Sequence, residues 1–185
     1  MKHTHEASNS NDYSMAAAVA RYVELLDVRL VTIDAKFHDP TESSQGLRVG
    51  TSREMSARFD EARRVATVHA HLRATVSHER PPAAPVFELS CHYVLDYRFA
   101  VSGGPEGDER NTYLGAFANV NGIYNVWPYF RELVQSVTSR MGLPPLVLPV
   151  YRVNRDEASP APRHDGAGAT RARSTRRPRA KSPGT

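Results

Sequence analysis

The sequence predicts an α+β fold in which a four-stranded antiparallel sheet packs against a long C-terminal helix. Four runs alternate apolar and polar residues with a period of two, and a later run repeats its apolar residues at helical spacing. Alternation of this kind gives each strand one buried and one wet face, which is typical of antiparallel rather than parallel sheets. The 185 residues suit one domain, expected over 14–153, with disordered extensions at 1–13 and 154–185.

The first expected element is a short amphipathic helix that follows the polar N-terminus. Ser14 is the expected N-cap, because its hydroxyl oxygen can accept a hydrogen bond from the first turn. The apolar residues after it recur at helical spacing: Met15, Val19, Tyr22, Val23 and Leu26.

The four expected strands span 28–37, 54–60, 65–76 and 87–101. The last is the clearest, because every second residue from Phe87 to Val101 is apolar. Prolines before this strand and a Ser-Gly-Gly-Pro run after it mark its ends.

The C-terminal helix is expected to begin near Pro128, whose missing N–H costs nothing in a first turn. Its apolar residues then follow helical spacing up to Met141. Gly142 is the expected C-cap glycine, and the two prolines after Leu143 prevent the helix from continuing. An extended apolar segment over 146–153 completes the body.

The net charge of +4 and the pI near 9.4 come from one end of the chain. Residues 152–185 carry nine Lys or Arg and three acidic residues, hence +6, and leave −2 for the remainder. From residue 154 onward there is no Val, Ile, Leu, Met or aromatic residue, so this tail is expected to be disordered. It is interpreted either as a solvated tail or as a site of non-specific attraction to RNA, DNA or anionic lipid.

No sequence motif indicates an enzyme or a cofactor. The single cysteine, Cys91, excludes an internal disulfide and a multi-cysteine metal site, and phosphate-binding loops, GxSxG and HExxH are absent. His69, His71 and His92 fit either a polar strand surface, the interpretation we favour, or a three-ligand metal site. No apolar run approaches the roughly 18 residues of a spanning helix, and no secretory signal begins the chain, so we expect a cytoplasmic protein without membrane insertion.

Apolar residues are in excess around the C-terminal helix. They crowd 123–130 and continue through 143–151, whereas one helix over four strands covers only one face of a sheet. Either all of them form the core, or some contact another subunit or an apolar ligand.

The same region resembles the export chaperone SecB. That family carries a Leu-Gly-Ala triplet, a Phe-Pro-Tyr-Ala-Arg-Glu helix start, an Arg-Gly helix end and a proline-rich exit. The matching stretches here are 114–116 (LGA), 127–132 (WPYFRE), 139–142 (SRMG) and 143–150 (LPPLVLPV). The resemblance covers about 27–153.

The resemblance implies a sheet whose second and third strands form a hairpin, assembled as a dimer of dimers. It also implies an ATP-independent chaperone, or holdase, that binds unfolded, export-bound proteins in apolar grooves. The residues expected in client binding or assembly are Phe37, Leu47, Val49, Phe59, Tyr124, Trp127, Phe130, Leu143 and Leu146.

The chain departs from that family at three places. SecB docks the translocase motor SecA through an acidic patch, and the matching positions here are Asp34, His38, Ser90 and His92. The crossover loop, often Phe- and Trp-bearing in the family, offers only Leu47 and Val49. The usual acidic end is replaced by the basic tail. These departures favour a partner other than SecA, and some SecB-like proteins protect an antitoxin of a toxin–antitoxin module. The alternative is a nucleic-acid-associated protein that uses its arginine-rich tail.

Overall fold

A computed structural model describes residues 10–38, 46–78, 85–100, 103–107 and 109–151. The chain divides into two units, 1–155 and 156–185, and all described residues lie in the first. The expected basic tail and residues 1–9 therefore lie outside the described residues.

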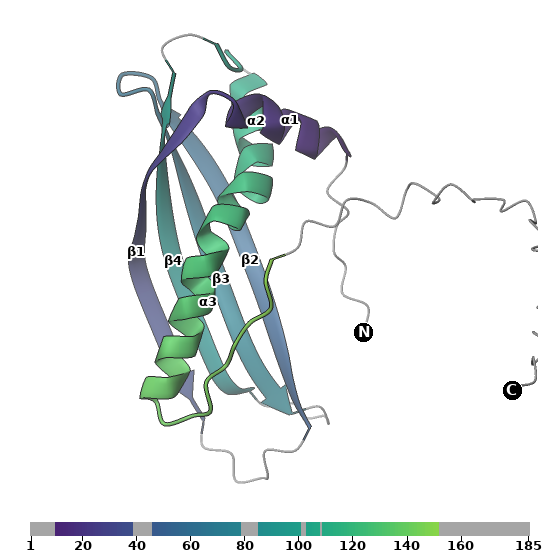
Figure 1. The fold of residues 1–185 in the computed structure, drawn as a ribbon, viewed down its shortest axis with the longest axis vertical. Helices are drawn as coiled ribbons and strands as arrows, with labels where there is room; N and C mark the ends of the chain where they lie inside the picture. Colours follow the sequence, from purple (N-terminus) through teal and green to yellow (C-terminus); the bar gives the residue numbers. More distant parts are fainter. Residues whose placement is uncertain (1–9, 39–45, 79–84, 101–102, 108, 152–185) are drawn as a thin grey trace, which may run out of the picture. The chain divides into compact units, whose positions relative to one another are not determined.

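The four strands form one antiparallel sheet, as the sequence predicts (Figure 1). They are β1 (Val23–Phe37), β2 (Leu47–Asp60), β3 (Val65–His78) and β4 (Pro85–Phe99). Their order is β1-β4-β3-β2, so that β2 and β3 form the expected hairpin. This order places β1 and β2 at the two edges of the sheet.

The first helix differs from its prediction at both ends. Helix α1 spans Ser10–Ala20, so Ser14 lies within it rather than at its N-cap, and residues 10–13 are helical. The predicted helical residues Val23 and Leu26 belong to β1 instead. The reason is tertiary: Val23 pairs with Phe99 and Leu25 with Tyr97 of the buried strand β4, and such pairing outweighs a local helical pattern.

The C-terminal helix also begins earlier than expected. Helix α2 (Glu109–Phe117), the π-helical turn η1 (Ala118–Gly122) and α3 (Ile123–Arg140) run on without a break in the chain. Pro128 lies inside α3, not in its first turn. It is exposed, so the carbonyl oxygen that its missing N–H leaves unpaired lies on the side of the helix nearest water. The end of α3 is confirmed, because Gly142 follows it with a φ of 75°.

The core lies between the helices and one face of the sheet, which we call the helix-side face (Figure 1). The alternating residues from Phe87 to Phe99 of β4 and from Ala66 to Ala74 of β3 are buried there. From the helices, Leu114, Phe117, Ile123, Val126, Trp127, Phe130 and Val134 complete it. The other face of the sheet, which we call the outer face, carries the polar residues of the same strands.

Residues 143–151, which we call the strap, return along the helix-side face in an extended conformation (Figure 1). Leu148 of the strap is buried in the core. The Trp127 indole donates a hydrogen bond to the Pro149 carbonyl oxygen at 2.8 Å, and Arg131 Nε donates to the Leu148 carbonyl oxygen at 2.7 Å. The strap is therefore held by side chains and not by strand pairing.

Candidate functional site

Strand β1 exposes apolar side chains on the helix-side face. We call this set the β1 apolar strip: Leu25, Leu30, Ile33 and Phe37, between 37% and 45% exposed. Each pairs with a buried residue of β4, namely Tyr97, Tyr93, Cys91 and Phe87 in the same order. Since directly paired residues point to the same face, the strip lies on the same face as the core, beyond what the chain's own helices cover.

The start of β2 adds a second exposed apolar pair on that face. Leu47 and Val49 are 37% and 43% exposed, and Val49 pairs with Val76 of β3. Phe59, at the other end of β2, is only half-buried. Its ring packs edge-on against Phe99 at 5.0 Å, and the Arg110 guanidinium lies 4.4 Å from its centre. Phe59 is thus packed within the chain, whereas Leu47 and Val49 are available to a partner.

The residues of α3 and the strap that the sequence predicts for client binding or assembly differ in how exposed they are. Tyr124 is 60% exposed, whereas Trp127 and Phe130 are buried and their rings lie 5.5 Å apart. Leu143 and Leu146 of the strap are half-buried against the core. Trp127 and Phe130 therefore belong to the core that supports the apolar surface. Of the five predicted residues, Tyr124 alone is largely exposed.

Sequence reasoning missed part of this surface. Leu25 falls in the segment that the sequence predicts as the first helix, whereas it belongs to β1. Leu30 is missed because the β1–β4 pairing is irregular at Leu30/Thr32, which changes the residues that share a face. A strict period of two places Val31 with Ile33, but the irregularity brings Leu30 to that face. No local signal in the sequence marks these two positions.

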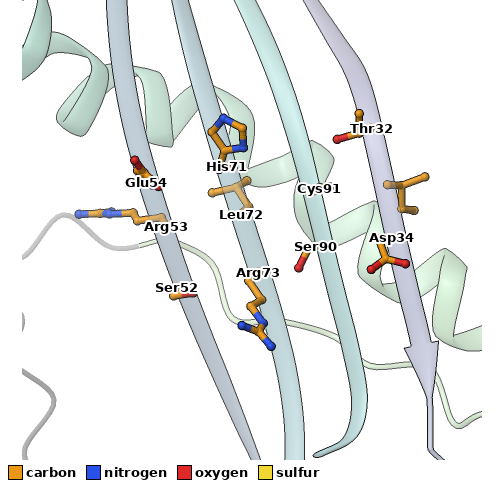
Figure 2. A pocket seen from close by; sticks show the side chains of 11 residues that line it. Thr32, Asp34, Ser52, Arg53, Glu54, His71, Leu72, Arg73, Ser90 and Cys91 are labelled. Carbon is orange, nitrogen blue, oxygen red and sulfur yellow. The ribbon is translucent and has the colours of Figure 1, made fainter.

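The outer face contains a hollow of about 400 Å³ where the resemblance would place a docking patch (Figure 2). Asp34 of β1 and Ser90 of β4 are paired in register and both line it. Asp34 is bound by Lys36 at 3.1 Å, and nearby Arg73 binds Glu88 at 2.7 Å. The surface is accordingly of mixed charge and not acidic.

The two remaining positions of the expected docking patch, His38 and His92, are not among the residues that line the hollow. His38 follows β1, and its backbone N–H donates to the Val86 carbonyl oxygen at 2.9 Å. His92 pairs with Thr32 and belongs to a group of three imidazoles.

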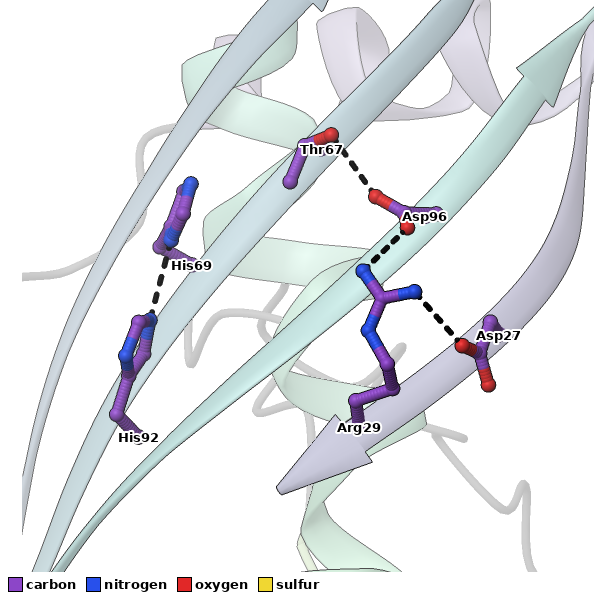
Figure 3. A network of polar contacts seen from close by, with 6 residues as sticks. All are labelled: Asp27, Arg29, Thr67, His69, His92 and Asp96. Carbon is purple, nitrogen blue, oxygen red and sulfur yellow. Dashed lines mark hydrogen bonds and ion pairs between the residues drawn. The ribbon is translucent and has the colours of Figure 1, made fainter. Parts of the chain in front are cut away.

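His92 contacts both His69 and His71 on the outer face, and Figure 3 shows the pair formed by His69 and His92. His69 Nδ1 lies 3.1 Å from His92 Nε2, and the His71 and His92 rings stack at 4.1 Å with planes 10° apart. Burial lowers the pKa of His69 and of His92, and the neighbouring imidazoles, with Arg58 for His69, lower these pKa values further. As the rings lie, no three His, Cys, Asp or Glu side chains among the described residues are arranged to hold a metal ion.

The carboxylate of Asp96, near the three histidines, already has hydrogen-bond partners. Asp96 accepts hydrogen bonds from Arg29 at 2.7 Å and from the Thr67 hydroxyl at 2.8 Å, and Arg29 also binds Asp27 (Figure 3). Asp34 does not approach Asp96. Asp34 of β1 pairs with Ser90 of β4, which lies several residues along the strand from Asp96.

Cys91 is buried on the helix-side face and does not provide a nucleophile. Burial raises the pKa of its thiol to about 12, so the thiol stays protonated at neutral pH. Burial likewise raises the pKa of Tyr97 to about 12. Within the described residues, no helix is long and apolar enough to cross a membrane.

The fold and this surface define an α+β protein whose helix-side face carries more apolar surface than its own helices cover. No family model matches the chain. The sequence is similar to two curated relatives, the SecB-like chaperones Rv1957 and MT2006 from two strains of Mycobacterium tuberculosis. Each is 27% identical over 152 residues, covering 74% of this chain and 81% of the relative.

A solved structure has the same fold. The Mycobacterium tuberculosis SecB-like chaperone Rv1957, in complex with a ChAD peptide from the HigA1 antitoxin, superposes with a TM-score of 0.65 and 23% identity, covering 77% of this chain and 99% of that one. Together these comparisons confirm the predicted resemblance of the chain to the SecB-like family.

Proposed function

We propose that this protein is an ATP-independent holdase that binds apolar segments of unfolded proteins in the cytoplasm. The observation that carries the proposal is the β1 apolar strip, which lies on the core face of the sheet and is still exposed. Removing such surface from water contributes about 25 cal/mol per Å² and has no directional requirement, so many client sequences can bind. Cys91, the single cysteine of the chain, is buried and its thiol pKa is raised to about 12, so it is not an activated nucleophile.

The position of the strip also supports assembly as a dimer of dimers. Strand β1 is an edge strand, so one side of its backbone is unpaired by the sheet. Pairing of β1 with β1 of a second copy would satisfy that edge and place the two strips on one continuous face, in the self-complementary manner of a two-fold interface. Tyr124 and Tyr129, exposed on α3, offer apolar surface for the second contact.

Among possible clients, we infer an antitoxin in preference to cargo handed to SecA. The relative of known structure is in complex with an antitoxin peptide, and the hollow on the outer face here is lined by both acidic and basic residues. Asp34 is retained, but it is paired with Lys36, and the other three positions are His38, Ser90 and His92. Export-bound proteins stand as the alternative clients.

The test combines sizing with suppression of aggregation. A double variant, Leu30→Ser with Ile33→Ser, should keep the fold, because both side chains are exposed, and should lose both assembly and protection of an unfolded client. Thr32→Ala, on the same strand, is the matched control and should behave as the wild type. A wild-type protein that is a monomer and gives no protection would contradict the proposal.

The basic tail motivates a second candidate, a nucleic-acid-associated protein. Residues 152–185 carry +6 of the charge, and binding through them should fall steeply with salt because counterions are released. Deleting 154–185 should abolish nucleic-acid binding and leave client protection unchanged. Nucleic-acid binding by the truncated chain would rule out the tail as its cause.

A further inference from the structure

We propose that His69, His71 and His92 form a binding site for a divalent transition-metal ion of the kind that prefers imidazole, such as Zn²⁺ or Co²⁺. The site lies on the outer face, away from the apolar surface assigned to clients. It rests on observations independent of the proposed holdase function.

The backbone brings the three residues together. His69 and His71 are two apart on β3, so both side chains point to the outer face. His92 of β4 is paired directly with His71. Directly opposed residues of antiparallel strands have Cβ atoms about 4.5–5.5 Å apart. Three histidine ligands from the protein plus one open position form a well-known zinc arrangement.

Two of the donors already stand at a suitable separation. His69 Nδ1 and His92 Nε2 are 3.1 Å apart. In a tetrahedral complex with Zn–N bonds of about 2.0–2.1 Å, two ligand nitrogens lie about 3.3 Å apart. Binding therefore requires the two ring nitrogens to turn toward a common ion, with little change in their distance.

The third donor needs a ring rotation. The His71 ring now stacks on His92 at 4.1 Å, which is why the three rings as they lie do not surround an ion. His71 is exposed, and the torsion that turns an imidazole about its Cβ–Cγ bond is broad. Metal binding therefore requires His71 to rotate out of the stack so that a third nitrogen faces the pair, and water would complete the coordination.

Neutral imidazole is the form of histidine that binds metal. The neighbouring carboxylate of Asp96 on β4 is engaged by Arg29 of β1 and by Thr67 of β3, so the three imidazoles are the ligands that the proposal uses. A bound ion would link β3 to β4 and would stabilise the folded chain by mass action.

The experiment titrates the metal-free full-length chain with Zn²⁺ by equilibrium dialysis, and with Co²⁺ by visible absorption. Both His71→Gln and His92→Gln should weaken Zn²⁺ binding by more than the about 10–100-fold that loss of an outer-shell partner costs. The variants should also lose the strong Co²⁺ absorption of a low-coordinate site. His78→Gln, at the end of the same strand β3, is the matched control and should retain both signals.

Histidines outside the described residues, such as those at 3 and 5, are present in every variant and contribute equally. The ring signals of His69, His71 and His92 in NMR spectra should shift together on Zn²⁺ addition. Equal affinity in the wild type, His71→Gln and His92→Gln would overturn the proposal, as would an equal loss in His78→Gln. Client protection is measured alongside, and its failure alone would count against the holdase and not against the metal site.

Discussion

The backbone N–H of Leu146 donates a hydrogen bond to the side-chain oxygen of Thr138 at 3.0 Å. Thr138 is a buried polar residue near the end of α3, and its hydroxyl in turn donates to the Val134 carbonyl oxygen at 2.9 Å. The Leu143 N–H donates to the Thr138 backbone carbonyl oxygen, also at 3.0 Å. A single threonine therefore fastens the start of the strap to the last turn of the helix.

Thr138→Val should lower the free energy of unfolding by about 1–3 kcal/mol, because it leaves the Leu146 N–H without its partner in a partly buried position. Urea unfolding followed by circular dichroism measures the change. Ser139→Ala is the control: Ser139 donates to the Gln135 carbonyl oxygen at 2.8 Å but is exposed, so its stability should stay within about 0.5 kcal/mol of the wild type. Equal losses in both variants would show that the strap contact is unimportant.

Gly122→Ala should destabilise the chain, because Gly122 packs closely against side chains of the sheet. A Cβ there would sit 3.0 Å from Val68 Cγ1 and 3.3 Å from Met55 Cε. Overpacking of this kind costs about 1–3 kcal/mol. At Gly115 of α2 a Cβ meets nothing within 4 Å, so Gly115→Ala should instead stabilise the helix by about 0.5–1 kcal/mol. Thermal melts of the two variants should shift in opposite directions, and shifts of the same sign would refute the packing argument.

Acidification should destabilise the fold through His69 and His92. Both pKa values are lowered in the folded chain, so below about pH 6.5 the unfolded chain binds more protons than the folded one. Stability is therefore highest above that pH and is lost as the pH falls toward the folded pKa values. Urea midpoints between pH 8 and pH 5 in metal-free buffer should fall for the wild type, and less for His92→Gln. An identical slope for the two proteins would exclude His92 as a source of this loss.

Trp127→Ala should cost about 3–5 kcal/mol of stability, the usual loss for a buried aromatic residue. Trp127→Phe keeps most of the ring but removes the N–H that binds the Pro149 carbonyl oxygen, and should cost less. We expect assembly or client protection to weaken in Trp127→Ala, because the core beneath the apolar surface would lose this ring. Guanidinium unfolding, sizing and an aggregation assay on the same samples measure these effects, and wild-type values throughout for Trp127→Ala would show that its burial has no structural role.

The sequence predicts four strands from their alternation of apolar and polar residues. It is wrong about the second strand, which it begins at 54, because Leu47 and Val49 belong to β2 and not to a loop. It fails where tertiary contacts decide. The start of β1 reads as helix, yet Val23 is held by pairing with Phe99. Pro128 suggests a helix start, yet α2 and η1 precede it in one helical run.

The candidate site follows the same rule. Phe37, Leu47, Val49 and Tyr124 are exposed apolar residues as a surface role requires. The burial of Trp127 and Phe130 was not foreseeable, because local spacing does not tell a core aromatic residue from a surface one. The pairing irregularity beside Leu30 depends on β4, which lies far away in the chain.

The strand order has a consequence for how the chain acquires its structure. β2, β3 and β4 are consecutive and pair with their chain neighbours, whereas β1 pairs only with β4. During synthesis β1 emerges first, yet its partner is completed last. Closing so long a loop is slow compared with forming hairpins. A nascent chain thus carries the apolar side chains of β1 without a partner until β4 is made, and is itself open to aggregation during that interval.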